Sequence, residues 1–181
     1  MSQYLTPNEF LLFYDARRVL EYASDSGTAA TDISQNLIVL RAIQGASSEL
    51  DNALQKGGRY LRQTIEDICD AARVDGAAEA DQKRAASIFE LVAHLTYGRL
   101  VSRRGTSAEA LRQLCPMYEE AQRRIADISN GVEVFDIAAN INAAKPQTTP
   151  IGRKGHSITT GNRLFSVSTI NPAFFGEPYC G

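Results

Sequence analysis

From Thr6 to Gly131 the sequence repeats one pattern, in which apolar residues recur at helical spacing until a glycine or a run of small polar residues interrupts them. Such a succession of amphipathic segments can bury its apolar faces only by packing helix against helix. The 181 residues are enough for one domain with a hydrophobic core of its own. We therefore expect a mainly α fold, with a helical bundle over residues 1–137 and an extended C-terminal arm over residues 138–181.

The first two predicted helices are short. Thr6 can cap the first one, Pro7 suits its first position, and Glu9 completes a capping box. A second helical stretch covers about 15–23, and the small polar residues of 24–28 end it. Both helices therefore precede the longer elements that should form most of the core.

A long helix is predicted to begin at Thr31 or Asp32, either of which can cap it, and to end before Gly57. Its apolar residues recur at helical spacing: Ile33, Leu37, Leu40, Ile43, Leu50 and Leu54. At about 1.5 Å per residue this helix would be roughly 36 Å long. A further helix is predicted over residues 60–73, and the turn-forming run at 74–76 interrupts it.

The next predicted helix covers about 78–103, and two arginines and Gly105 mark its C-terminal end. Its apolar stripe consists of Ile88, Leu91, Val92, Leu95 and Leu100. The last helical region begins at Thr106 or Ser107 and stops at Gly131. Its apolar residues form a heptad-like seam that packs in the core of the subunit or between neighbouring copies: Leu111, Leu114, Tyr118, Ala121, Ile125 and Ile128.

Pro116 interrupts this last region, so it should either kink the helix or begin its second half. Two ion pairs at i and i+4 are predicted on the solvent face of the second half, Glu119 with Arg123 and Glu120 with Arg124. Each of these pairs would stabilise the helix by about 0.3 kcal/mol.

The character of the chain changes after Gly131. Residues 132–137 could form a short strand, and residues 138–181 hold four of the six prolines and show no helical period. Within this arm, two runs that mix apolar and polar residues lie on either side of Gly161-Asn162. They predict a β-hairpin from about Ser157 to Ser168. The hairpin either folds back on its own domain or serves a partner.

Charge is unevenly distributed along the chain. The net charge is −2, but the residues after position 140 include Lys145, Arg153, Lys154 and Arg163 against Glu177 alone. The first 140 residues therefore carry −5, and the acidic body and basic arm are expected to do different jobs. The N-terminus does not have the pattern of a signal peptide and no apolar run is long enough to span a bilayer, which predicts assembly in the cytoplasm and no membrane partner.

Catalytic signatures are absent from the sequence. There is no phosphate-binding loop, His-Glu-x-x-His or Cys-x-x-Cys motif, so we expect no enzyme, no metal and no cofactor. His94 lies among apolar helix positions and is interpreted as a structural histidine. Cys69 and Cys115 are interpreted as small core residues, while Cys180 is the reactive thiol. The acidic residues Glu66, Asp67 and Asp70 are expected on an exposed helix face.

The basic arm leaves two functions open. The run from Gly152 to His156, with Arg153 and Lys154 at its centre, could contact phosphates or an acidic protein surface. The first possibility makes the chain a small helical nucleic-acid-binding or regulatory protein. No clear helix-turn-helix is present, and an acidic body is unusual for a dedicated DNA reader.

Four blocks of the sequence resemble the Mu-like head–tail connector (adaptor) family of tailed phages and prophages. They are the opening Tyr4–Phe10, the long-helix block from Ala42 to Tyr60, the last-helix block from Tyr118 to Gly131, and the arm segments Arg163–Ser166 and Phe174–Gly176. The blocks occur in the family's order and cover most of the chain. Residues 61–78 depart from the family, which usually has a short proline-containing link there.

The resemblance implies a structural virion protein of the phage neck. Subunits of this family form a ring, commonly dodecameric, between the portal protein and the stopper or tail-completion proteins, and DNA passes through the ring without specific binding. The arm typically reaches up to the portal. The residues of this chain that would bind it are Arg153, Lys154, Arg163, Phe165, Phe174 and Phe175.

Overall fold

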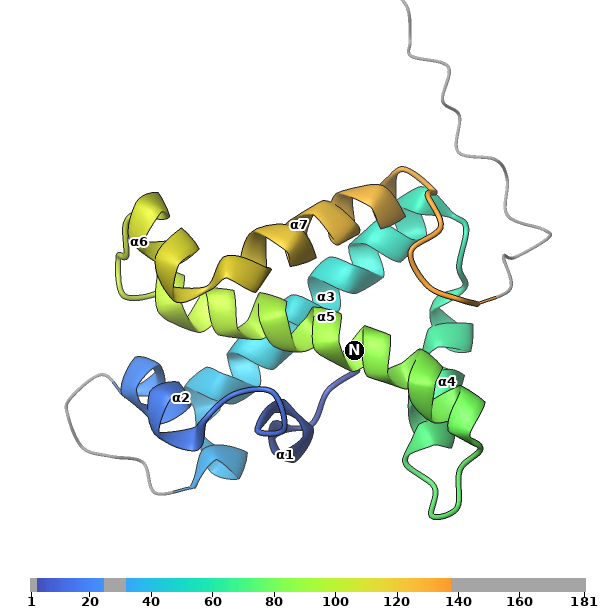
Figure 1. The fold of residues 1–181 in the computed structure, drawn as a ribbon, viewed down its shortest axis with the longest axis horizontal. Helices are drawn as coiled ribbons and strands as arrows, with labels where there is room; N and C mark the ends of the chain where they lie inside the picture. Colours follow the sequence, from blue (N-terminus) through green and yellow to red (C-terminus); the bar gives the residue numbers. More distant parts are fainter. Residues whose placement is uncertain (1–2, 25–31, 138–181) are drawn as a thin grey trace, which may run out of the picture. The chain divides into compact units, whose positions relative to one another are not determined.

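The computed structural model of the chain describes residues 3–24 and 32–137 (Figure 1). Of these residues 72% are helical, and none of them belongs to a strand. The prediction of a mainly α fold is therefore confirmed. The predicted hairpin, Ser157 to Ser168, lies outside the described residues. None of the helices in the described ranges is both long and apolar enough to cross a bilayer.

Seven α-helices and one short 3-10 helix make up the described part of the chain. In order they are α1 (Pro7–Phe10), α2 (Ala16–Ala23), the 3-10 helix η1 (Ile33–Gln35), α3 (Leu37–Gly57), α4 (Arg62–Ala72), α5 (Glu79–Ser102), α6 (Ala108–Leu114) and α7 (Pro116–Ser129). Helix α5 runs through the middle and contacts each of the other six α-helices (Figure 1). Helices α3 and α7 pack on it and on each other.

The central position of α5 follows from its composition. A helix surrounded by other helices must be apolar on all sides rather than along one stripe. The five stripe residues predicted from the sequence are all buried, and Ala93, Tyr97 and Val101 are buried on other faces of the same helix. The buried hydroxyl of Thr96 donates a 2.7 Å hydrogen bond to the Val92 carbonyl, so it stays satisfied in the core.

Two glycines let α7 approach α3 and α5 closely. A Cβ atom added to Gly57 of α3 would lie 1.8 Å from the Ile128 carbonyl oxygen of α7, and one added to Gly98 of α5 would lie 2.1 Å from the Tyr118 ring. Neither distance is compatible with a real side chain. These two positions therefore set how closely the three central helices pack.

The predicted start of the long helix is wrong. Asp32 caps η1 instead, and α3 begins at Leu37, because the Asn36 side chain accepts hydrogen bonds from Ile38 N and Val39 N. Leu37, predicted in the apolar stripe, is 66% exposed. The predicted end is confirmed to within a residue, since Gly58 follows α3 in the left-handed conformation with φ of 67°.

Pro116 begins a new helix rather than kinking an existing one, so the last helical region is split into α6 and α7. Leu114, predicted in the core seam, is 47% exposed at the junction of the two helices. The prediction fails there because the change of direction at Cys115 takes Leu114 out of the helical period that the rest of the seam follows.

One of the two predicted ion pairs is present. Arg124 lies 3.5 Å from Glu120, as expected. Glu119 instead pairs with Arg112 of α6, at 2.5 Å, and Arg123 lies 3.8 Å from Glu120. The predicted pair of Glu119 with Arg123 is thus wrong, because the turn between α6 and α7 offers Glu119 a closer partner.

Candidate functional site

The residues predicted to bind a partner all lie outside the described residues. They are Arg153, Lys154, Arg163, Phe165, Phe174 and Phe175. The same holds for His156 and Cys180. The structure therefore neither supports nor contradicts their predicted roles, and the candidate site is built from the surfaces that it does describe.

The segment that leads toward the arm, residues 132–137, is held by one side chain. The Tyr60 hydroxyl accepts hydrogen bonds from Val134 N, at 3.1 Å, and Phe135 N, at 3.2 Å, and it donates one of 3.1 Å to the Phe135 carbonyl. The predicted strand is wrong here, because a tyrosine hydroxyl satisfies the backbone groups that a neighbouring strand would otherwise pair.

Side chains reinforce this attachment. The Phe135 ring is buried against the Tyr60 ring, with centroids 5.6 Å apart, and Ile137 is also buried. Arg59 forms an ion pair with Glu133 on the outside. The last described residues are therefore fixed beside the junction of α3 and α4, and sequence periodicity offers no signal for a contact of this kind.

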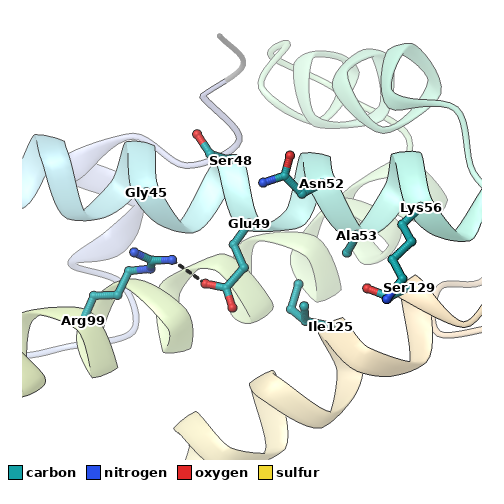
Figure 2. Close-up of a pocket in the computed structure, with 9 residues that line it drawn as sticks. All are labelled: Gly45, Ser48, Glu49, Asn52, Ala53, Lys56, Arg99, Ile125 and Ser129. Carbon is teal, nitrogen blue, oxygen red and sulfur yellow. Dashed lines mark hydrogen bonds and ion pairs between the residues drawn. The ribbon is translucent and has the colours of Figure 1, made fainter.

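A polar groove of about 400 Å³ lies where α3, α5 and α7 meet (Figure 2). Across it Arg99 of α5 and Glu49 of α3 form a 2.6 Å ion pair. Gly45 makes room for the arginine, since an added Cβ would lie 3.0 Å from one of its terminal nitrogens. Further along α3, the Lys56 side chain extends toward Ser129 of α7 (Figure 2).

The lining of this groove combines polar side chains with apolar surface. Glu49 compensates the charge of Arg99. Lys56 is the other cation that lines the groove, and the lining contains no second carboxylate to pair with it. The lining residues include no histidine and no cysteine. The groove can accept hydrogen bonds from, or donate them to, a polar partner, and its two serines, Ser48 and Ser129, have no histidine of the lining beside them to act as a general base.

A cluster of aromatic side chains joins the turn before α2 to α5. The Tyr14 ring stacks on Tyr97 with centroids 4.0 Å apart, and Tyr22 meets Tyr97 edge to face at 5.8 Å. The Tyr14 hydroxyl lies 2.6 Å from His94 Nδ1. Burial lowers the pKa of His94, so the imidazole is neutral at pH 7, in agreement with the structural role predicted for it.

The two described cysteines are unreactive. Burial raises the pKa of the Cys69 thiol to about 12 and that of the Cys115 thiol to about 11. Both thiols are therefore protonated at neutral pH, and only the thiolate is a nucleophile. Both side chains are buried, which confirms their prediction as small core residues.

Two arginines have a role that the sequence did not indicate. Arg103 donates a 2.8 Å hydrogen bond to the Tyr22 carbonyl, and Arg104 donates to the carbonyls of Glu21 and Ser24. They were predicted to stabilise the end of their own helix. They lie at the C-terminal end of α5 as predicted, and they also satisfy carbonyls at the C-terminal end of α2, where a helix carries partial negative charge.

Within residues 3–24 and 32–137, no group of three or more histidine, cysteine or carboxylate side chains could hold a metal ion. Comparison of the chain with protein-family models, with curated proteins and with solved structures finds no match. Inference about function therefore starts from the residues and surfaces of this chain.

Proposed function

We propose that this chain is a structural protein of the neck of a tailed phage, a head–tail connector that works as a ring between the portal protein and the stopper or tail-completion proteins. The observation that carries the proposal is the arrangement of the sequence blocks that resemble the connector family. The three of these blocks that fall in the described ranges meet in a single core around α5.

The first block buries Tyr4, Leu5 and Phe10 completely or nearly so. Its Tyr4 hydroxyl donates a hydrogen bond to Asp51 of the long-helix block. Positions that carry a family resemblance are expected to share one core when the resemblance reflects a common fold.

The second and third blocks meet in the same way. The long-helix block ends at Tyr60, whose hydroxyl holds the segment that follows the last-helix block. Ile128 of the last-helix block is buried, and its carbonyl lies over Gly57. This packing supports a helical-bundle adaptor domain over residues 1–137 and an arm over residues 138–181.

The charge of the chain suits a channel through which DNA passes without specific binding. The first 140 residues carry −5, and phosphate contacts that retain DNA need lysine and arginine in excess. Under this proposal the protein is assembled in the host cytoplasm, is incorporated into the virion, and is not an enzyme.

Co-expression with the portal protein tests the proposal. We expect the two proteins to co-purify as a ring complex, and the double substitution Phe174→Ala/Phe175→Ala to weaken the complex at least tenfold, since buried aromatic anchors dominate many interfaces. Gln44→Ala, at an exposed position of α3, is the matched control. Absence of the complex, together with salt-sensitive DNA binding that Arg153→Ala/Lys154→Ala removes, would favour the nucleic-acid-binding alternative.

A further inference from the structure

The two ends of α5 carry opposite charge. At its C-terminal end, Arg103 and Arg104 bond to backbone carbonyls at the end of α2. We term the exposed residues of these segments the arginine end, namely Leu12, Phe13, Arg17, Arg18, Arg103 and Arg104. Its four arginines are exposed, and the carboxylates that the structure describes in the same segments are Asp15 and Glu21. Leu12, in the turn that leads into α2, is 82% exposed. The arginine end is therefore basic and apolar at once.

At the N-terminal end of α5 lies a surface that we term the carboxylate end, which consists of Asp67, Asp70, Val74 and Asp75. Residues 61–78 hold four carboxylates against Arg62 and Arg73. Both arginines are engaged in ion pairs, Arg62 with Glu66 and Arg73 with Glu9 and Asp70, which leaves Asp67 and Asp75 without an arginine of this segment beside them. Val74 is 64% exposed in the turn before α5. The carboxylate end is therefore acidic and apolar at once.

The two surfaces belong to segments at opposite ends of the central helix. Helix α5 has 24 residues and is thus about 36 Å long, with α2 at one end and α4 at the other (Figure 1). The surfaces of a single subunit cannot meet across that length. Within residues 3–24 and 32–137 of one chain, neither surface therefore covers the other.

We propose that the arginine end of one copy of this chain docks on the carboxylate end of the next copy. The contact is head-to-tail, and repeated contacts of this kind close into a ring when the rotation between copies permits it. This inference rests on the proposed ring function and assigns the surfaces that join its subunits.

Charge complementarity selects a second copy over other partners. Among the described residues, the arginine end has two more positive than negative charges, and residues 61–78 have two more negative than positive ones, so the two surfaces are of opposite sign. Exposed Leu12, Phe13 and Val74 would become buried in the same contact. A nucleic acid would engage only the arginine end and would leave Val74 exposed among carboxylates.

Both surfaces are held rigidly enough to serve as a defined contact. Arg103 and Arg104 fix the C-terminal end of α2. Helix α4 is anchored on its inner side by Ile65 and Cys69, which are buried. The inference also gives residues 61–78, which depart from the connector family, a role in joining the subunits.

Cross-linking of two singly substituted full-length chains tests the contact, in a Cys180→Ser background where the remaining thiols, Cys69 and Cys115, are buried. One chain carries Ala16→Cys beside the arginine end and the other Ala71→Cys beside the carboxylate end; both alanines are exposed. With a short bis-maleimide, the mixed pair should react at least tenfold faster than either chain with itself. Ala126→Cys, at an exposed alanine of α7, is the control for random collision.

Charge reversal sharpens the same experiment. Arg17→Glu/Arg18→Glu should reduce the mixed product at least tenfold, and Asp67→Arg/Asp75→Arg on the other chain should restore it when both changes are present. Added salt should slow the reaction of the unsubstituted ends because it screens the attraction.

The proposal is overturned if the mixed pair reacts no faster than the Ala126→Cys control, or if either chain reacts with itself as fast as with the other. A ring seen in the phage neck together with either result would leave the proposed function standing and place the subunit contact elsewhere. Absence of the ring would count against the proposed function itself.

Discussion

The two ends of α5 are attached to the rest of the protein by different chemistry. Near α2, Arg103 and Arg104 donate to uncharged backbone carbonyls, and His94, in the same half of α5, lies 2.6 Å from the Tyr14 hydroxyl. Near α4, Arg73 pairs with the carboxylate of Glu9, at 2.8 Å, and of Asp70. Arginine therefore serves as a helix cap at one end and as an ion-pair partner at the other, and the two ends should respond differently to substitution and to acid.

The largest expected effect concerns the glycines at which α7 approaches its neighbours. Gly57→Ala would place Cβ on the Ile128 carbonyl, which is backbone and cannot rotate away, so we expect a loss of about 3 kcal/mol in the free energy of unfolding. Gly98→Ala meets the Tyr118 ring, which can move, and should cost less. Urea denaturation of the purified chain measures both.

Gly45→Ala is the matched control for these two changes. Its Cβ would meet only the flexible end of Arg99, and alanine favours a helix over glycine by about 1 kcal/mol. Equal destabilisation by all three substitutions would contradict the close approach of α7.

A smaller effect is expected from Tyr60→Phe, which removes the hydroxyl that holds residues 134 and 135. The buried N–H of Phe135 and the part-buried N–H of Val134 would lose their partner, which should cost about 2 kcal/mol. Hydrogen exchange at the amides of Val134 and Phe135 should accelerate. Exchange in the middle of α5 should accelerate only by the amount that the lower free energy of global unfolding accounts for. Unchanged exchange at both amides would rule out the Tyr60 attachment.

Arg73→Gln should cost less again, about 1 kcal/mol, because its partners are partly exposed. The loss should appear as faster exchange in α1 and the N-terminal segment, since Arg73 also donates to the Tyr4 carbonyl. Arg104→Gln should instead loosen the C-terminal turn of α2. A substitution that loosened both regions equally would show that the two ends are not independent.

The smallest effects are expected from pH, in two separate windows. Burial lowers the pKa of His94 from its usual 6.5, so protonation favours the unfolded chain and stability should begin to fall as pH drops below about 6.5. Burial alone would raise the pKa of Glu9, but hydrogen bonds from Arg73 and Thr6 lower it below 4.5. The stability contributed by Glu9 should therefore be lost only below about pH 4.5.

Denaturation curves measured across this pH range separate the two contributions. His94→Gln should reduce the pH dependence of the free energy of unfolding in the upper window. Glu9→Gln should reduce it in the lower window. If His94→Gln flattened only the lower window, the assignment of the two groups to the two ends would be wrong.

Local signals explain how much of the fold the sequence predicted. The capping box at Thr6, the glycine stop at Gly58 and the apolar positions of α5 depend on neighbours a few residues away, and each was predicted. Asn36 shows the limit of such signals, since Thr31 and Asp32 nearby could also cap a helix.

Long-range contacts explain what the sequence did not predict. The Tyr60 hydroxyl bonds to Val134 and Phe135, which lie 74 and 75 positions further along the chain. Arg104 donates a hydrogen bond to α2 across more than 80 positions. No periodicity encodes such pairs, because they depend on how the helices pack. The charges could be counted along the sequence, but only the structure shows which of them lie near which end of α5. The predicted arm residues, Arg153 to Phe175, lie outside the described residues and stay predictions.

Cryo-electron microscopy of the phage particle, or of this chain co-expressed with its portal protein, tests the central claim most directly. The account predicts a ring of this chain directly below the portal, with residues 138–181 contacting the portal and DNA passing through the centre. A neck that is fully accounted for by other proteins would contradict it.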